Sequence, residues 1–477
     1  MIHSHLNNAE LQENEASIAW KSAATISICL GIFLYSVFFR TYSVGQTFHL
    51  FGDQIRDWRI AARAFSDLPL VGTPRVDGGT SFGPVYYWVL WLIYHTIGPW
   101  FDYLPHAGGY GLSILHASAE SFLLYAMIEF GIAMPVALTA SLILTSLPME
   151  SFLSATIWNP GLSASFAMSG VGWFLLRVKA MNAWNFLLIS GLSIFAVQSH
   201  TPALFMAVPL VIAAAKAWRD QGGNRVWWLA LGLVTSMVVV MELPYLYGHF
   251  FRLQAAGGET ILQLRLGQLG GDLLSLLRSL RIVGSFHFVV MALMPLLIDS
   301  LSGNFAAAAM VWTVTALIVI VRNGLVAPIA ILTIGTFMAT WIGWSLWPNA
   351  FESYWLISAF GVFMVGLAVA VNFHWRSSGL ILGCIGLVTV LSMQHRLFNE
   401  RNAMSGLPEY GSLIDIARQV AAANVPVRDL QGVPTKFTEQ LQYLVQILGG
   451  KIDSGALSIA KIDRSGRVSI ESAHVAL

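Results

Sequence analysis

The sequence is poor in charged residues and in cysteine. Only 11% of its 477 residues are charged, the 26 basic and 25 acidic side chains leave a net charge of +1, and there are two cysteines. A main role in nucleic-acid binding is excluded, because such proteins carry a basic stripe or patch. Cys29 and Cys384 both lie in apolar runs, so we expect neither a disulfide nor a thiolate metal site.

Apolar residues are abundant instead. They make up 56% of the chain, and the mean hydropathy is +0.66, which is typical of a protein embedded in a bilayer. Two apolar segments, residues 81–98 and 284–299, are compatible with spans or with interfacial helices. The sequence therefore predicts an all-α polytopic membrane protein with about 11 to 13 transmembrane helices, at residues 22–39, 108–129, 132–149, 160–176, 183–198, 201–217, 226–246, 303–321, 325–346, 352–373 and 378–395.

The basic residues between the spans indicate an orientation. If both ambiguous segments are interfacial, these residues lie on the side of the N-terminus: Arg177, Lys179, Lys216, Arg219, Arg225, Arg322 and Arg376. The positive-inside rule makes that side cytoplasmic. The N-terminal tail lacks the basic region and cleavage site of a signal peptide, so we expect the first span to be retained. The outward segments are then 40–107, 150–159, 247–302, 347–351 and the C-terminal tail.

Composition changes near residue 396. The last 82 residues contain 9 of the 26 basic and 8 of the 25 acidic side chains, as a soluble domain would. Two amphipathic helices are predicted at 412–424 and 435–448, followed by a hairpin that turns at Asp463–Gly466. We therefore divide the chain into a membrane domain, residues 1–395, and a small α+β domain, residues 396–477. The small domain carries no metal or nucleophile motif, and accessory packing is its expected role.

The segment FGDQIRDWRIAARAF, residues 51–65, directly follows the first span. Placed on a helix over residues 53–67, it separates an apolar arc from a polar one, and only Ile60 interrupts the polar arc. We expect this helix to lie in the membrane interface, with Asp53 kept ionised at its positive end. In the alternative interpretation the polar residues form ordinary ion pairs on a wet face. The apolar arc contains Ile55, Trp58, Ala61, Ala62 and Phe65, and the polar arc Asp53, Arg56, Asp57, Arg59, Arg63 and Asp67.

A Gly-rich loop with Arg75 and Asp77 follows, and then the aromatic segment GPVYYW at residues 83–88. In this order, the acidic residue, the amphipathic helix and the aromatic segment resemble the lipid-carrier-dependent glycosyltransferases of the GT-C fold. That group contains the protein O-mannosyltransferases and the aminoarabinose transferase of lipid A. The resemblance continues through residues 156–166 and 196–209, and so covers roughly the first half of the chain.

The resemblance implies an inverting glycosyltransferase that moves a sugar from a polyprenyl (undecaprenyl) phosphate to a glycan, lipid or protein acceptor. It would act on the outer face of a bacterial inner membrane, with the C-terminal domain in the periplasm. Asp53 matches the catalytic base, and Arg56 a basic residue that faces the carrier phosphate. The leaving phosphate is already stable, so a single base suffices. Further candidates for donor binding are Arg75, Tyr86, Tyr87, Asn159, His200 and Tyr354, while Asp57 and Arg63 complete the polar face of the helix.

Three positions depart from the family pattern. Gln54 and Asn159 stand where acidic residues are expected, and Ser81 to Gly83 replace a lysine whose charge Arg75 or His200 could supply. Hard divalent cations prefer carboxylate ligands, so the sequence supports no metal site and no other cofactor. His200 also fits a helix-end histidine without a chemical role.

Other polar features allow functional and structural interpretations. His116 and Glu120 share a helix face, and Glu129 and Glu242 lie near span ends. These intramembrane charges either have a function or are structural, the first two as a satisfied buried pair and the last two by reaching the interface. Residues 259–284, with Arg265, Arg278 and Arg281, predict a second interfacial helix that borders a carrier groove or only covers the membrane surface. An O-antigen polymerase or ligase, or a secondary transporter of a lipid-linked or sugar substrate, is the alternative function. A transporter, however, should show paired repeats. A non-catalytic membrane protein is the least favoured interpretation.

Overall fold

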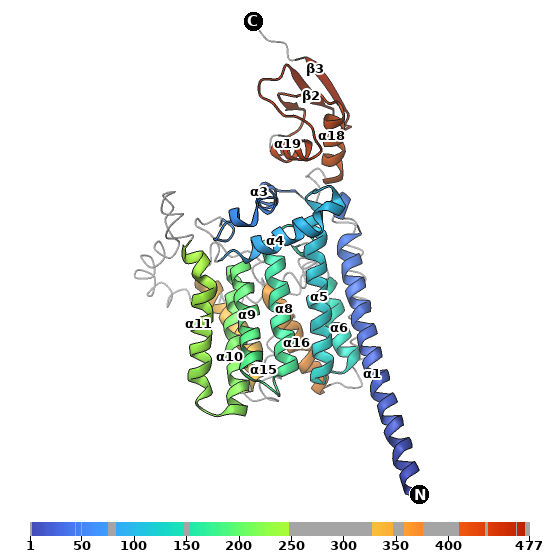
Figure 1. Cartoon of the computed structure of the whole chain (residues 1–477), viewed down its shortest axis with the longest axis vertical. Coiled ribbons are helices and arrows are strands. Elements are labelled where there is room, and N and C mark those ends of the chain that lie inside the picture. The colour runs from blue at the N-terminus through green and yellow to red at the C-terminus, as the bar shows by residue number, and fades with distance from the viewer. Residues whose placement is uncertain are drawn as a thin grey trace.

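A computed structural model describes residues 2–42, 44–48, 50–74, 83–146, 153–247, 327–346, 357–374, 410–434, 437–463 and 465–472. Long antiparallel helices form a bundle below a layer of short helices, and a small domain sits above that layer (Figure 1). The bundle helices are α1 (Ile2–Thr41), α5 (His106–Phe130), α6 (Met134–Ser146), α8 (Asn159–Arg177), α9 (Ala183–Ser199), α10 (Leu204–Gly222), α11 (Val226–Tyr247), α15 (Pro328–Leu346) and α16 (Ile357–His374).

The bundle confirms the predicted helical polytopic fold. Among the described residues, four helices are long and apolar enough to cross a membrane: Ser22–Thr41, His106–Phe130, Thr201–Gly222 and Val226–Tyr247. Every predicted span that falls on described residues coincides with a bundle helix. The spans at 303–321 and 378–395, and the segments 259–284 and 284–299, lie outside the described residues.

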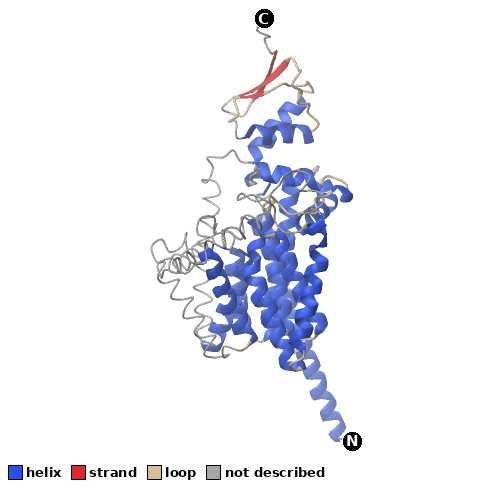
Figure 2. Cartoon of the chain, turned by 90° about the vertical axis from the view of Figure 1, so that its left-hand side faces the viewer, coloured by secondary structure: helices blue, strands red, loops and turns tan. Residues whose placement is uncertain are grey.

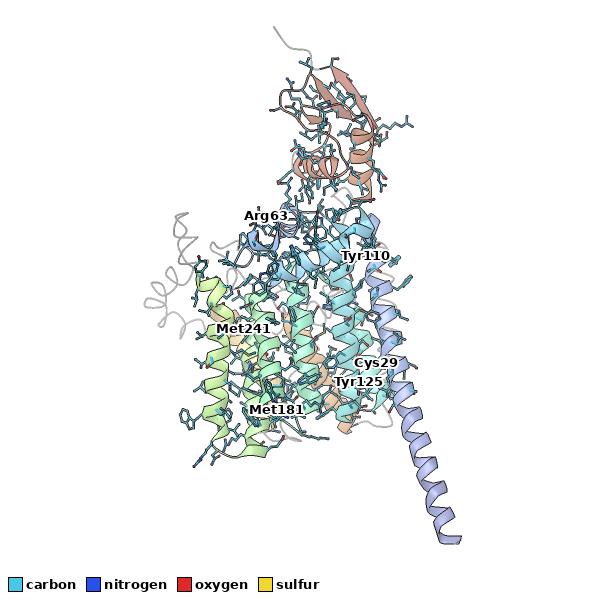
Figure 3. All side chains as sticks on the ribbon, in the orientation of Figure 1. Cys29, Arg63, Tyr110, Tyr125, Met181 and Met241 are labelled. Atoms are coloured by element: carbon cyan, nitrogen blue, oxygen red, sulfur yellow. The ribbon has the colours of Figure 1, made fainter. Side chains whose placement is uncertain are left out.

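Two of the basic residues used for the predicted orientation lie at one end of the bundle. Arg177 ends α8, Arg219 lies in the last turn of α10, and both are at the end where the N-terminus emerges. Met181 lies near this basic end and Arg63 at the opposite one (Figure 3). The arrangement agrees with the relative sidedness that the charge pattern predicts.

The opposite end of the bundle is covered by what we call the loop layer. It consists of α2 (Val44–Thr47), α3 (Gly52–Ala61), α4 (Val85–Thr96) and the 3-10 helices η1 (Phe65–Asp67), η2 (Gly98–Phe101) and η3 (Thr201–Ala203). Helix α4 settles one of the two ambiguous segments. Its 12 residues extend about 18 Å, too short for a hydrocarbon core of about 30 Å, so α4 is not a span.

Helix α3 is shorter and more enclosed than its sequence pattern predicts. Ile55, Trp58 and Ala61 are fully buried, as expected, but the helix ends at Ala61, and Phe65 is exposed on η1. The predicted helix to residue 67 is therefore wrong at its C-terminal end. The apolar face also packs within the protein rather than into lipid, since the Trp58 indole N–H donates to the carbonyl of Tyr103 at 2.7 Å. Ile60, which interrupted the polar arc, is buried as well.

The small domain contains α18 (Tyr410–Ala422), β1 (Leu430–Gln431), α19 (Thr438–Ile447), β2 (Ser458–Ile462) and β3 (Val468–Ser472). All strands drawn in Figure 2 belong to it. Strands β2 and β3 form the predicted antiparallel hairpin, and β1, which we did not predict, pairs with β2 in parallel. The α+β prediction is confirmed, while the boundary at 395/396 lies outside the described residues and stays a prediction.

A buried ion pair connects the first two long helices of the bundle. The Arg40 guanidinium donates to a Glu120 carboxylate oxygen at 2.6 Å, and both side chains are fully buried. Ser36 and Thr145 donate to the other carboxylate oxygen. His116 lies 3.7 Å from the first one. His116 and Glu120 therefore share one buried helix face, as their spacing predicts, and whether the pair has a function stays open. Arg40 lies at the end of the first apolar run, and its sequence position alone does not show that it is buried.

Candidate functional site

Helix α3 begins beside Asp53, the predicted base. The backbone N–H of Phe51 donates to the side-chain oxygen of Gln54 at 3.1 Å, which caps the start of the helix. Gln54 is buried, so the residue that departs from the acidic family pattern has a structural task here. Asp53 is half-buried in the first turn, where one carboxylate oxygen accepts the Gln54 backbone N–H at 3.0 Å. Within the described part of the chain it forms no ion pair.

The second carboxylate, Asp57, lies one turn further along and is enclosed. It accepts hydrogen bonds from Arg56 Nε at 2.8 Å and from the Tyr87 hydroxyl at 3.2 Å, and it is only 2% exposed. Burial raises its pKa to about 6 against the opposing effect of Arg56, and Asp53 adds to the rise. The polar arc of the predicted helix is therefore divided: Asp57 faces α4, and Arg63 is exposed.

Arg56 is held in place by this neighbour. Its Nε and one terminal nitrogen both bond Asp57, the latter at 2.8 Å, while 38% of the side chain stays exposed. A guanidinium offers five N–H donors in a fixed fork, so donors remain for an anion on its exposed side. Arg56 is thus an oriented positive charge next to an ionisable carboxylate, Asp53.

Tyr86 and Tyr87 open α4 and are both 1% exposed. Tyr87 donates to Asp57, whereas the buried hydroxyl of Tyr86 has no hydrogen-bond partner among the described residues. Burial raises the pKa of Tyr86, and the charges of Asp57 and Asp53 raise it further. Its ring centroid lies 5.5 Å from that of Tyr87, the residue that donates to Asp57. A buried hydroxyl without a partner is costly in a native fold and points to a ligand or an ordered water.

The turn before α4 depends on Gly83. Its φ of +64° suits glycine, and a Cβ added there would lie 2.4 Å from the side-chain carbonyl carbon of Gln198. Gln198 cannot easily retreat, because its amide donates to the Met241 carbonyl at 2.8 Å and to Glu242 at 3.0 Å. The GPVYYW segment is thereby fastened to α9 and α11.

We therefore expect Gly83→Ala to lower the unfolding free energy by about 2 kcal/mol, through backbone strain and a side-chain clash together. The measurement is the thermal midpoint of the detergent-solubilised protein. Gly131→Ala is the matched control, since it has φ of +106° but open space around the added Cβ. Equal losses in the two variants would contradict the contact with Gln198.

Asn159 begins α8, and His200 ends α9. The Asn159 amide donates to the Ser199 carbonyl at 2.8 Å and to the Thr73 hydroxyl at 3.3 Å. A carboxylate could make neither donation, which gives Asn159 a structural reason for replacing the acidic residue of the family pattern. His200 is buried at the C-cap of α9, with its backbone N–H bonded to Ala196. This is the helix-end position considered as the alternative for it.

The structure thus brings together Asp53, Arg56, Asp57, Tyr86 and Tyr87, and places Asn159 and His200 at the bundle end beneath. Arg75 and Tyr354 lie outside the described residues. No group of three or more His, Cys, Asp or Glu side chains that could hold a metal ion occurs among the residues described, and metal independence stays a prediction. Gln54 as a cap and Arg40 as a buried ion were missed, because both roles depend on contacts that the sequence does not show.

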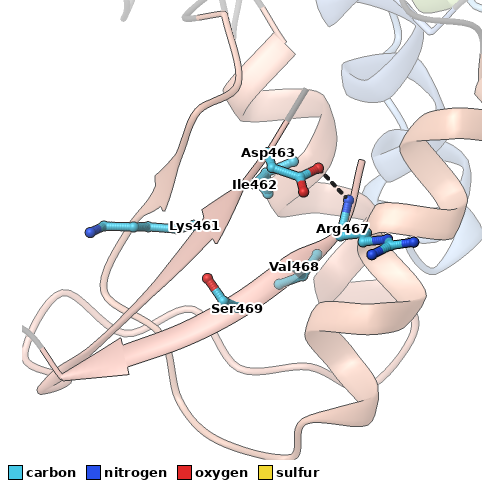
Figure 4. A pocket seen from close by; sticks show the side chains of 6 residues that line it. All are labelled: Lys461, Ile462, Asp463, Arg467, Val468 and Ser469. Carbon is cyan, nitrogen blue, oxygen red and sulfur yellow. Dashed lines mark hydrogen bonds between the residues drawn. The ribbon is translucent and has the colours of Figure 1, made fainter. Parts of the chain in front are cut away.

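A separate depression of about 350 Å³ lies in the small domain (Figure 4). Lys461, Asp463 and Arg467 are among the residues that line it. Asp463 accepts the backbone N–H groups of Ser465 and Arg467, at 2.8 and 3.0 Å, and thereby shapes the β2–β3 turn. None of its residues is a predicted site residue.

Comparisons with known proteins give similarity of structure but not of sequence. No protein-family model and no curated protein matches the chain. ArnT from Cupriavidus metallidurans bound to undecaprenyl phosphate is similar at 13% identity, over 90% of this chain and 85% of its own, with a TM-score of 0.48. The Archaeoglobus fulgidus oligosaccharyltransferase in complex with zinc and sulfate is similar at 13% identity and a TM-score of 0.44, over 87% of this chain and 57% of its own.

Proposed function

We propose that this chain is an inverting glycosyltransferase that uses a polyprenyl-phosphate sugar as donor. The observation that carries the proposal is the contrast between two carboxylates one helical turn apart. Asp57 is sealed by Arg56 and Tyr87, whereas Asp53 is half-buried and has one oxygen without a partner in the described structure. A base must reach the proton that it removes, and only Asp53 has this access.

The proposed reaction proceeds in a single displacement. Asp53 removes the proton of an acceptor hydroxyl, whose oxygen attacks the anomeric carbon from the face opposite the phosphate. The bond between the sugar and the phosphate oxygen breaks, and the electron pair leaves with the polyprenyl phosphate, so the anomeric configuration inverts. Arg56, which Asp57 orients, stabilises the negative charge that develops on the leaving phosphate.

The location of the site agrees with such a substrate. The basic residues that end α8 and α10 lie at one end of the bundle, which the positive-inside rule makes cytoplasmic. The loop layer lies at the opposite end, which is then extracytoplasmic. A polyprenyl chain would stay in the bilayer while its phosphate and sugar reach α3 at the membrane surface. We therefore place the reaction on the outer face of a bacterial inner membrane, with a glycan, lipid or protein acceptor. A lipid-linked sugar polymerase would use the same donor class, but nothing in the described site favours it.

The test is to supply the purified protein in lipid nanodiscs with a panel of polyprenyl-phosphate sugars, using as acceptors the envelope glycans and lipids of cells that lack the protein. We expect transfer from one donor, with NMR showing an inverted anomeric configuration in the product. Retained configuration would contradict the single-base mechanism. Absence of transfer from every donor, together with no accumulation of a lipid-linked sugar in cells lacking the protein, would refute the function.

Asp57 makes both stability and transfer depend on pH, but in opposite directions. Its pKa in the fold, about 6, exceeds the ordinary 3.8, so its contribution to stability is fully present below about pH 4 and is lost as the pH rises through 6. Asp57→Asn should therefore leave the thermal midpoint at pH 7.5 unchanged or higher. Transfer should nevertheless fall about tenfold, equivalent to roughly 1.4 kcal/mol, because Arg56 loses its orienting charge.

In the unmodified protein, transfer should also decline below about pH 6, as protonation of Asp57 weakens its hold on Arg56. Midpoints and initial rates measured between pH 5 and pH 8 check both expectations. An Asp57→Asn protein that is less stable at pH 7.5 but fully active would contradict this role for the carboxylate.

A further inference from the structure

The small domain touches the helix that carries the site. Helix α19 contacts α3, and α18 contacts α2 (Figure 1). One hydrophobic cluster runs through both parts, with Ile55 and Trp58 from α3 and Leu441 and Leu444 from α19 among its buried members. The contact is therefore part of a shared core, as expected for an interface that holds its two sides in a fixed geometry.

Two side chains of α19 contact Arg59, which lies on α3 between Asp57 and the end of the helix. The Arg59 guanidinium sits over the ring of Tyr443, 4.5 Å from its centroid. Glu439, one turn earlier on α19, approaches the same guanidinium at 3.8 Å. A Cβ added to Gly52, the residue before Asp53, would lie 3.8 Å from a Glu439 carboxylate oxygen. The Glu439 side chain therefore lies close both to Gly52, at the start of α3, and to Arg59, near its end.

Tyr443 is the better buried member of this contact. It is 7% exposed, while Arg59 and Glu439 keep 44% and 63% of their side chains exposed. Tyr94 of α4 packs against the same hydrophobic cluster as Tyr443, so the ring lies close to α4 as well. Burial raises the pKa of the Tyr443 phenol, and Tyr94 raises it further. Tyr94 in turn packs against Trp58, with ring centroids 4.9 Å apart. The Tyr443 ring consequently contacts α3 through Arg59 and lies near the aromatic cluster that seats α3 on α4.

Helix α3 needs such support. It has ten residues, and a helix of this length is marginal on its own. Towards α4, Asp57 accepts a hydrogen bond from Tyr87, and towards α19, Arg59 makes a cation–π contact with Tyr443. Catalytic groups lose much of their effect when they are misplaced by about 1 Å, so a helix that bears two of them must be fixed from both sides.

We propose that the C-terminal domain positions α3, with Tyr443 and Glu439 acting on Arg59 as a clamp. Its role thereby exceeds the accessory packing that composition suggested. The three residues touch no reacting atom, so they are positioning residues. The expected effect on turnover rests on the proposed function, but the expected effect on the position and exchange of α3 does not.

The test compares Arg59→Gln, Tyr443→Leu and Tyr443→Phe in the full-length protein. Hydrogen exchange of the α3 backbone amides should be faster in the first two variants and unchanged in Tyr443→Phe, which keeps the ring under the guanidinium. Turnover should fall about tenfold in the same two variants, the order expected for displaced catalytic groups, and be retained in Tyr443→Phe. The double variant Arg59→Gln/Tyr443→Leu should be no slower than either single one, because both remove the same contact.

Glu471→Gln is the matched control, since it breaks an ion pair with Lys461 in the same domain, at 2.6 Å and away from α3. It should change neither exchange in α3 nor turnover. Unchanged exchange in both Arg59→Gln and Tyr443→Leu would overturn the clamp, as would additive losses in the double variant. Faster exchange supports the clamp even if the unmodified protein transfers no sugar, a result that would refute only the proposed function.

Discussion

Replacement of Asp53 by asparagine should lower sugar transfer on the order of a thousandfold, because an amide cannot accept the proton of the acceptor hydroxyl. The variant should fold normally. Asp53 is half-buried, and its hydrogen bond comes from the backbone N–H of Gln54, which an asparagine oxygen can still accept. The measurement is the initial rate of transfer from the polyprenyl-phosphate donor in nanodiscs, together with the thermal midpoint.

Asp67→Asn is the control for this variant. Asp67 is an exposed carboxylate on η1, in the same loop layer, and its described hydrogen bond comes from the neighbouring Ser66. It should transfer at the normal rate. Full activity in a correctly inserted Asp53→Asn protein would remove Asp53 from its role and leave no accessible base on the described part of α3.

The second large effect concerns stability. Arg40→Met should destabilise the protein by about 4 kcal/mol, because it leaves Glu120 as a buried charge without its main partner. The measurement is the free energy of unfolding of the protein in detergent, obtained from thermal melting. The double variant Arg40→Met/Glu120→Met should be less destabilised than Arg40→Met alone, since no isolated charge remains.

An exposed ion pair serves as the comparison. Lys216 and Asp220 are paired one turn apart on α10, where 14% of the Lys216 side chain and 46% of the Asp220 side chain are exposed. Asp220→Asn should cost less than about 0.5 kcal/mol, because water screens such pairs. If Arg40→Met were as mild as Asp220→Asn, the buried network would not hold α1 against α5 as we infer.

The sequence could predict α3 only in part. Its periodicity identified Ile55, Trp58 and Ala61 as the buried face, since a 3.6-residue repeat depends on local order alone. It could not show that Asp57 is enclosed, because this depends on Tyr87, thirty positions away in the chain. Nor could it place the end of the helix at Ala61, which precedes the exposed turn leading to η1.

The candidate site shows the same division. The resemblance selected Asp53 and Arg56 and noted that Gln54 and Asn159 depart from the expected pattern. The structure gives the departure at Asn159 a reason, since its amide donates to the Ser199 carbonyl, whereas a glutamate could cap α3 as Gln54 does. The Asn159 contact joins residues forty positions apart, so no local pattern reveals it.

By itself, the sequence determined that this is a polytopic helical membrane protein with a small α+β domain at its C-terminus. Apolar length and charge distribution carry that information, because the bilayer acts on each segment separately. Only the tertiary structure decided which of two carboxylates on α3 stays accessible, that Arg40 is a buried ion, and that α19 grips Arg59. These are pairwise contacts between distant parts of the chain, and they exist only once the helices have packed together.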